Sequence, residues 1–304
     1  MSTTDLVIRA LAEGEEQLFN SLSDTGLVGR AAAGDRYSAG EYRPEWSWLA
    51  LRGNTVVARA AWWGGPDDDE PIALDWFDFT DAEAAVRLLR TVPLNTDYVL
   101  RMPPDFESRP EVKAEATKRI DAALAAGLVP LVERYRYRWT PDCGVPDRPG
   151  RLIFRPEPDN KVILDVLRDI EQGSLDAHSQ RALKQSGLDY AAQDELDSLT
   201  WLPGPREWWR LGYTESGELV GFVAPSRNYA DPVIGFVGVV PAQRGHGYAY
   251  DLLVEGTHVL VEQGADRIIA STDVTNTPMA ANFAKAGYPV QWRQVDLGPR
   301  PATT

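Results

Sequence analysis

The spacing of apolar residues in the second half of the chain changes repeatedly between the two-residue period of a strand and the longer period of a helix. In chain order, this pattern predicts a strand, two helices and three strands over residues 151–155, 160–170, 175–199, 207–213, 218–223 and 233–240. Gly187 interrupts the second helix, and Gly217 marks the turn of a hairpin. A helix, a strand, a further helix and final strands complete the predicted order.

The first half of the chain repeats this order more faintly. Predicted strands cover residues 6–10, 46–51, 56–62, 72–77 and 98–101, and predicted helices cover residues 82–89 and 112–126. Gly127 follows the last helix, at a position where glycine commonly ends helices. We therefore predict two α/β domains of similar element order, with an unrelated α/β domain in the first half as the alternative.

The predicted boundary between these domains is a segment rich in proline and glycine. Residues 141–150 contain three prolines and two glycines, which interrupt the apolar periodicity. A chain of 304 residues is long for one compact domain and sufficient for two of about 150 residues each. We expect a first domain over residues 1–140, a linker over residues 141–150 and a second domain over residues 151–304.

The charge of the chain narrows the choice of partners. A net charge of −14 opposes binding to a phosphate backbone, so nucleic acid is not an expected partner. The acidic surface either serves solubility alone or attracts a cationic substrate such as an amine. No stretch approaches the roughly 18 apolar residues of a membrane span, and the start of the chain does not resemble a secretion signal.

The cysteine content is consistent with a cytoplasmic protein. Cys143 is the single cysteine, which excludes an internal disulfide and a cysteine-rich metal site. No spacing of histidine, cysteine and carboxylate residues resembles a set of metal ligands. We expect a cytoplasmic protein without a metal or a membrane partner, as a monomer or a homodimer.

A short glycine-containing segment carries the most specific chemical signal. Residues 243–253 follow a strand-like run and lead into an amphipathic helix. Gly245 and Gly247 would let successive backbone N–H groups close on an anion at the positive end of that helix. Arg244 would add a charge-assisted donor. The segment therefore predicts a phosphate-binding loop, although a simple tight turn between strand and helix would use the same glycines.

Two motifs in this half resemble those of the GNAT N-acetyltransferases. Residues 244–249, Arg-Gly-His-Gly-Tyr-Ala, are similar to the family's pyrophosphate loop R/Q-x-x-G-x-G/A. Residues 276–288 are similar to the family pattern N-x-x-A-x-x-L-Y-x-K-x-G-F and match it at Asn276, Lys285, Gly287 and Tyr288. The positions that depart from it are Met279, Asn282 and Phe283.

The resemblance implies two tandem GNAT-like domains, each with a mixed, mostly antiparallel sheet flanked by helices. It implies acetyl-CoA as the co-substrate, without a metal, and the following cofactor-binding residues: Val237, Gly238, Val239, Arg244, Gly245, His246, Gly247, Tyr248, Ala249, Asn276 and Phe283. The alternative role of Asn276 is to cap its helix. In the first half, Asp78 and Asp81 stand where a glycine loop would be, so that domain is expected to be degenerate.

The resemblance also implies a place for a general base and a general acid. Asp273 ends the predicted fifth strand of the second domain, at the level of the thioester, and is the candidate that accepts a proton or holds the amine. A turn-forming role is the alternative for Asp273. Phe283 stands where many family members place an acid tyrosine, which leaves Tyr288, water or no group at all as the acid.

The predicted function is acyl-CoA-dependent N-acyl transfer, with acetyl passing from acetyl-CoA to the amine of a small molecule by direct attack in the second domain. A non-catalytic protein that binds or senses acyl-CoA is the alternative. Ligation that depends on aminoacyl-tRNA is disfavoured by the intact loop and by the acidic charge.

Overall fold

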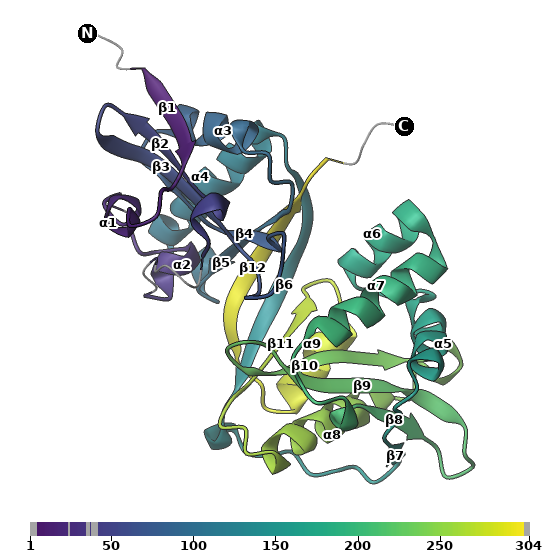
Figure 1. Cartoon of the computed structure of the whole chain (residues 1–304). Helices are drawn as coiled ribbons and strands as arrows, with labels where there is room; N and C mark the ends of the chain where they lie inside the picture. Colours follow the sequence, from purple (N-terminus) through teal and green to yellow (C-terminus); the bar gives the residue numbers. More distant parts are fainter. Residues whose placement is uncertain (1–4, 24, 35–36, 38–41, 301–304) are drawn as a thin grey trace. The chain divides into compact units, whose positions relative to one another are not determined.

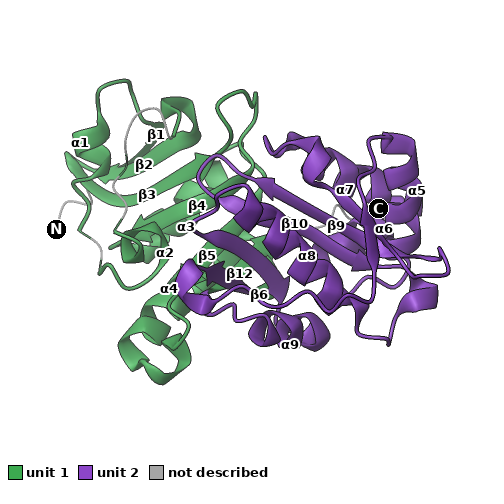
Figure 2. Cartoon of the chain, turned by 90° about the horizontal axis from the view of Figure 1, so that it is seen from below, with its two compact units in different colours: residues 1–133, 292–304 green, residues 134–291 purple. Residues whose placement is uncertain are grey.

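The structure is a computed structural model that describes residues 5–23, 25–34, 37 and 42–300. The chain divides into two compact units (Figure 2), of which unit 1 contains residues 1–133 and 292–304 and unit 2 contains residues 134–291. This division differs from the boundary expected at residues 141–150, since that segment lies inside unit 2. None of the described helices is both long enough and apolar enough to span a membrane.

The proline-rich segment lies inside unit 2 because its residues are fastened to one helix of that unit. His258 Nε2 donates to the carbonyl of Pro146 at 2.8 Å. Arg148 forms ion pairs of 2.8 Å with Glu255 and with Glu262. Apart from the 3₁₀ turn η3 (Pro141–Cys143), the segment has no regular structure. Its composition therefore indicated irregular backbone correctly but did not mark the division between the units.

Unit 2 contains most of the predicted second domain. Its helices are α5 (Asn160–Glu171), α6 (Ala177–Ser186), α7 (Leu188–Trp201), α8 (Tyr248–Glu262) and α9 (Thr277–Lys285). Its strands are β7 (Ile153–Arg155), β8 (Arg210–Tyr213), β9 (Leu219–Arg227), β10 (Pro232–Val239), β11 (Ile268–Asp273) and the second part of β6 (Val129–Trp139). The strand order is β6-β11-β10-β9-β8-β7, and only β10 and β11 pair in parallel. The predicted element order is confirmed from β7 to α9.

Helices cover both faces of the sheet in unit 2 (Figure 1). Phe222 and Ala224 of β9 pack in one core cluster with α5 and α7. Val223, between them, points to α8, where a Cβ built on Gly256 would lie 2.8 Å from its side chain. This alternation follows the two-residue period of a strand and leaves β9 apolar on both faces.

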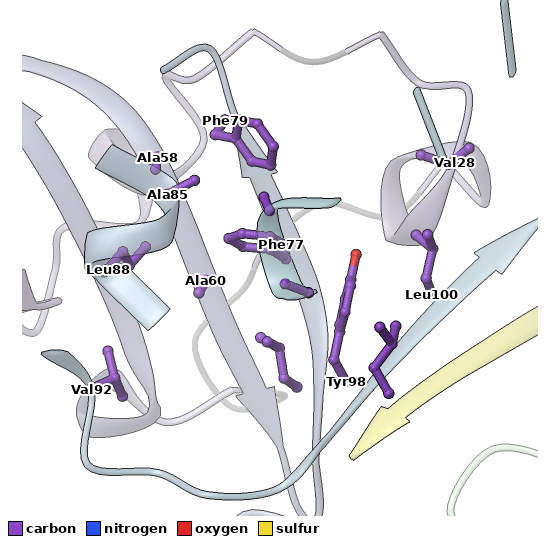
Figure 3. Close-up of a cluster of buried hydrophobic side chains, with 14 of the residues drawn as sticks. Val28, Ala58, Ala60, Phe77, Phe79, Ala85, Leu88, Val92, Tyr98 and Leu100 are labelled. Atoms are coloured by element: carbon purple, nitrogen blue, oxygen red, sulfur yellow. The ribbon is translucent and has the colours of Figure 1, made fainter. Parts of the chain in front are cut away.

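Unit 1 has a similar order. Its described strands and longer helices are β1 (Leu6–Ala10), β2 (Ser47–Arg52), β3 (Thr55–Trp63), β4 (Ala73–Phe79), α3 (Ala82–Thr91), β5 (Asp97–Met102) and α4 (Pro110–Ala126). Its short helical segments are α1 (Glu16–Phe19), α2 (Gly29–Ala32), η1 (Pro44–Trp46) and η2 (Phe106–Ser108). The strand order is β1-β2-β3-β4-β5-β12, where β12 is the last strand of the chain (Val290–Gly298), and β4 and β5 are parallel. Figure 3 shows its core, where Phe77 meets Tyr98 edge to face at 5.6 Å.

The last strand of the chain, β12 (Val290–Gly298), belongs mainly to unit 1. Its residues 293–297 pair with β5, in a register that places Leu297 opposite Tyr98. Conversely, residues 134–139 of β6 pair with β11 in unit 2. The sequence assigned residues 290–298 to the second domain, because periodicity identifies a strand but not the edge that it joins. The strand β6 did not appear among the predicted elements.

A buried ion-pair cluster fills unit 1 at the end of β4. Asp78 is 3% exposed and bonds Arg59 at 2.9 Å and Arg119 at 2.8 Å, while both arginines are equally buried. Burial alone would raise the pKa of Asp78, but the two guanidinium groups outweigh it and hold that pKa below its usual range. Arg119 also donates to the carbonyl of Phe77 at 3.2 Å.

This cluster occupies the region where β4 and β5 separate. The two strands pair only at Ala73 with Asp97 and at Leu74 with Tyr98. Beyond that point the free edge of β4 is met by the guanidinium of Arg119 from α4. The aspartates that were expected to oppose a pyrophosphate therefore have other roles, since Asp78 is buried and Asp81 caps α3 through Ala84 N at 3.0 Å.

Asp78→Asn should destabilise unit 1 strongly. The change removes the buried carboxylate that two buried guanidinium groups share, and breaking a buried ion pair typically costs about 3–5 kcal/mol. Asp69→Asn is the matched control, because Asp69 is exposed and the change removes the same charge. The free energy of unfolding from denaturant titration measures the difference, and equal values for the two variants would contradict this assignment.

Candidate active site

The candidate site lies where β10 and β11 separate. The two strands share a single parallel pair, Val233 with Ile269. The register of β10 against β9 then shifts between Ile234 and Phe236, which makes Gly235 the extra residue of a bulge. Because a bulge bends its strand, β10 diverges from β11 and its edge on that side is left without a strand partner over residues 236–239.

A cavity of about 620 Å³ fills this gap within unit 2. One wall is residues 234–239 of β10, and the opposite wall carries Ser271 and Thr272 of β11. The start of α9 and the segment before α6 line the remaining sides. A cavity of this size can hold the acyl end of a cofactor together with a small acceptor.

The loop from Gly245 to Gly247 offers several free backbone donors. Gly245 and Gly247 have φ values of +84° and +77°, a left-handed conformation that disfavours other residues. In the described chain, no hydrogen bond is donated by the backbone N–H groups of residues 245–249. These groups stand at the N-terminus of α8, the positive end of its dipole. The loop can therefore bind an anion, as its sequence predicted.

The side chain of Arg244 is used differently from the prediction. Its Nε donates to the carbonyl of Val239 at 3.1 Å, and its two terminal nitrogens donate to Gln172 at 2.7 Å and Ile170 at 2.6 Å. The guanidinium thus binds carbonyl groups at the end of α5 and joins that end to β10. Arg244 lines the cavity, but its guanidinium group is used to hold the cavity walls in position. The anion would therefore be held by backbone N–H groups.

Arg151, which precedes β7, contacts this loop and was not among the predicted site residues. It donates to the carbonyls of His246 at 3.0 Å and Gly247 at 3.3 Å, and it pairs with the buried Asp251. Each of these carbonyl groups shares a peptide unit with an N–H group that points the opposite way. By binding the carbonyl groups, Arg151 therefore orients those N–H groups away from itself. Asp251, in the first turn of α8, is the buried anchor of this arginine.

The cavity wall formed by β10 depends on small side chains. Val237, Gly238 and Val239 line the cavity and pair with β9 on their other edge. A Cβ built on Gly238 would lie 2.6 Å from Ile170, so glycine permits the close approach of α5. On the side that faces β11 this segment has no strand partner, and of its backbone groups the carbonyl of Val239 is bound by Arg244.

Asn276 and Phe283 also line the cavity, as predicted for the cofactor side. Asn276 caps α9 by accepting a hydrogen bond from Met279 N at 3.3 Å, and no hydrogen bond in the described chain uses its Nδ2. Phe283 is buried and stacks on Tyr137 at a ring distance of 4.3 Å. Asn276 can therefore cap its helix and also contact a cofactor. Phe283 forms an apolar part of the cavity wall.

Asp273 ends β11, as predicted, but its carboxylate is already engaged. It accepts a hydrogen bond from Ala177 N at 2.7 Å and lies 3.1 Å from Arg134 Nε. Burial raises the pKa of Asp273, as does the neighbouring Asp176, while Arg134 opposes the shift. Asp273 is buried against the N-terminus of α6 and does not line the cavity. Through the hydrogen bond from Ala177 N, Asp273 joins the end of β11 to the start of α6.

Tyr288, considered as a proton donor, is also remote from the cavity. Its hydroxyl is buried and shares a 2.7 Å hydrogen bond with Thr257. Burial raises the pKa of this phenol well above its usual value. Tyr288 is therefore a core residue that joins α8 to the segment after α9.

The side of the cavity formed by α6 and α7 is acidic. Asp176 and Glu195 line it, and Glu171 is buried nearby at the end of α5. Burial raises the pKa of Glu171 to about 7 and that of Glu195 to about 8. The sequence showed acidic residues in this region, but their periodicity did not distinguish a solvated surface from a cavity wall.

Comparison with known proteins agrees with this geometry. Residues 175–288 match the acetyltransferase (GNAT) family. A mycothiol acetyltransferase of Arthrobacter sp. (strain FB24) is 27% identical over 198 residues, and one of Pseudarthrobacter chlorophenolicus is 27% identical over 192 residues. Each match covers 59% of this chain and 56% of the relative, so the chain aligns with little more than half of each relative.

Solved structures share the fold at low sequence identity. A GCN5-related N-acetyltransferase from Sphaerobacter thermophilus has a TM-score of 0.57 at 16% identity and covers 98% of this chain and 97% of that chain. A tandem GNAT protein from the clavulanic acid biosynthesis pathway has a TM-score of 0.51 at 15% identity and covers 98% and 100%. The predicted fold class is confirmed. The parallel strands that separate after one pair, the glycine loop that opens α8 and the family match over residues 175–288 together show that unit 2 contains a GNAT acetyltransferase domain.

Proposed function

We propose that this protein transfers the acetyl group of acetyl-CoA to the amine of a small molecule, in the cavity of unit 2. The observation that carries the proposal is that one cavity runs from the edge of β10 that lacks a strand partner to Arg244 and Ala249, and the loop of unpaired backbone donors lies between these two residues in the chain. Such a site suits an extended molecule with a pyrophosphate at one end and a thioester at the other. The names of the relatives include mycothiol, so an acceptor related to mycothiol belongs in any substrate panel.

In this proposal each wall has a defined task. The N–H groups of residues 245–249 bind the pyrophosphate at the N-terminus of α8. The free edge of Val237–Val239 holds the pantetheine arm by main-chain hydrogen bonds, as an added strand would. The thioester then lies between β10 and β11, where a backbone N–H can stabilise the oxyanion that forms when the amine attacks.

We propose that unit 1 has no equivalent site. Its β4 and β5 also separate after a short parallel pairing, but Arg119 already occupies the carbonyl of Phe77 on the free edge of β4. The helix that follows, α3, begins at Asp81, which uses its carboxylate as the cap. In this proposal the degenerate character expected of the first domain follows from Arg119, which already binds the free edge of β4.

Gly247→Glu should lower the affinity for acetyl-CoA by on the order of 100-fold, or about 2.7 kcal/mol. The new side chain would begin 3.8 Å from Arg151, which orients the loop, it would add negative charge to a site for pyrophosphate, and the residue would resist the positive φ of Gly247. Gly264→Glu is the matched control, since Gly264 has a φ of +83° and open space around it at the other end of α8. Isothermal titration calorimetry measures both, and a second equivalent site in the wild type would contradict the proposal.

Transfer to an amine should release coenzyme A thiol, which a thiol reagent detects across an acceptor panel. The acyl-CoA sensor, the alternative function, binds acetyl-CoA and releases no thiol with any acceptor. Phe283→Tyr separates the two, because it restores a hydroxyl at the cavity wall. We expect the wild type to be active and the variant to differ by less than about tenfold, since a thiolate is already a tolerable leaving group. Activity in the variant alone would favour the sensor.

Asp273→Asn should reduce turnover by less than about tenfold. The asparagine oxygen can still accept from Ala177 N, so the position of α6 is largely kept. Loss of a general base would instead cost on the order of 10²–10⁴-fold. Steady-state turnover with the best acceptor decides between these outcomes, and a loss above about 100-fold would return Asp273 to the role of base.

A further inference from the structure

Among the ionisable side chains that line the cavity, most are already committed to protein partners. Arg244 donates to carbonyl groups of β10 and of the end of α5. Arg134 pairs with Asp176 at 3.1 Å and with Asp273 at the same distance. The ring of His178 lies 3.9 Å from Asp176. These groups shape the wall and hold α6 in place.

Glu195 is different. It projects from α7 and lines the cavity, yet none of the hydrogen bonds or ion pairs formed by described residues involves its carboxyl group. A second carboxyl group nearby is incompletely satisfied, because Glu171 is 1% exposed and its Oε2 has no hydrogen-bond partner in the described structure. Ser179 bonds the Glu171 carboxyl group, but buried carboxylate oxygens normally all accept hydrogen bonds, so this wall has fewer donors than its acceptors need.

The electrostatic surroundings of Glu195 favour a cation. Burial is the largest cause that raises its pKa to about 8, and Glu171, Asp176 and Asp194 add to it from three segments. Arg134 is the opposing group, and its charge is shared with two aspartates. A bound ammonium would supply both the missing donors and the missing positive charge.

We propose that Glu195 binds the ammonium group of the acceptor and accepts its proton, and that the acceptor is a primary amine without a carboxylate next to the reacting nitrogen. This inference rests on the proposed acetyl transfer. A carboxylate beside the amine would lie against the same acidic wall of Glu171, Asp176 and Glu195, and the ionised members of that wall would repel it. A neutral neighbour, such as an amide or a hydroxyl group, meets no such penalty.

The proton balance of the step is complete. The ammonium gives one proton to the carboxylate of Glu195 and becomes a neutral amine. Its lone pair forms the C–N bond to the thioester carbonyl carbon, and the C–S bond breaks as the tetrahedral intermediate collapses. The second proton, lost from the new amide nitrogen, ends on the coenzyme A thiolate. Glu195 then releases its proton to solvent.

Calorimetric binding tests the first part without any turnover. Glycinamide and glycine are titrated into protein loaded with coenzyme A. We expect the wild type to bind glycinamide at least about tenfold more tightly than glycine, and Glu195→Gln to lose at least about tenfold in glycinamide affinity. Asp197→Asn is the matched control, since Asp197 is exposed on the same helix and does not line the cavity. Equal binding by Glu195→Gln and wild type, preference for glycine or no binding of glycinamide would overturn the proposal.

The pH dependence of transfer tests the second part. In the wild type, kcat/KM should rise with pH to a midpoint near the pKa of about 8 of Glu195, because only its carboxylate form accepts the proton. Glu195→Gln should lower kcat/KM by on the order of 10²–10⁴-fold, and its residual rate should follow the ionisation of whichever amine is supplied.

The two proposals fail in distinguishable ways. If the wild type does not bind acetyl-CoA, the proposed function fails, while the glycinamide titration, run then without coenzyme A, still decides whether Glu195 forms an amine site. If acetyl-CoA binds and transfer occurs, but Glu195→Gln keeps the wild-type rate and pH profile, the role of Glu195 alone is overturned. Normal acetyl-CoA affinity in Glu195→Gln guards against a variant that has merely failed to fold.

Discussion

The site depends on one constraint, which is that two parallel strands must separate after a single residue pair. The bulge at Gly235 turns β10 away from β11, and Gly238 lets α5 pack against the strand that has turned. Buried main-chain N–H and C=O groups that lack a hydrogen bond raise the free energy of the folded state, so the separated edge requires hydrogen-bond partners. In unit 1, Arg119 of α4 binds this edge at Phe77, whereas in unit 2 Arg244 binds it at the last residue of β10, Val239, and residues 236–238 face the cavity.

Local features of this arrangement could be predicted from the sequence, because they are encoded by neighbouring residues. The strands, the helices and the turn at Gly245 and Gly247 follow from periodicity and from the backbone freedom of glycine. The partners of charged side chains could not be predicted in this way. Asp273 meets Ala177 across 96 positions and Arg244 meets Gln172 across 72, and no local pattern reports such separations.

The same limit explains the role of the acidic residues around α6 and α7. In sequence they contribute to a net charge of −14 and look like solvated surface. Only the fold distinguishes Glu195, which faces the cavity, from Asp197, two residues later and exposed. The function of a carboxylate in this chain thus depends on which side of a helix carries it.

The pairing of β12 with β5 has a consequence for how the chain is made. Unit 1 contains residues 1–133, yet its sheet gains a strand from residues 293–297, which are synthesised after unit 2. The edge of β5 that pairs with β12 therefore stays unpaired until the whole of unit 2 has been synthesised. At roughly 5–20 residues per second this interval lasts about ten seconds or more, during which an open strand edge is exposed to aggregation. A fragment that stops at the proline-rich segment would keep that edge open permanently.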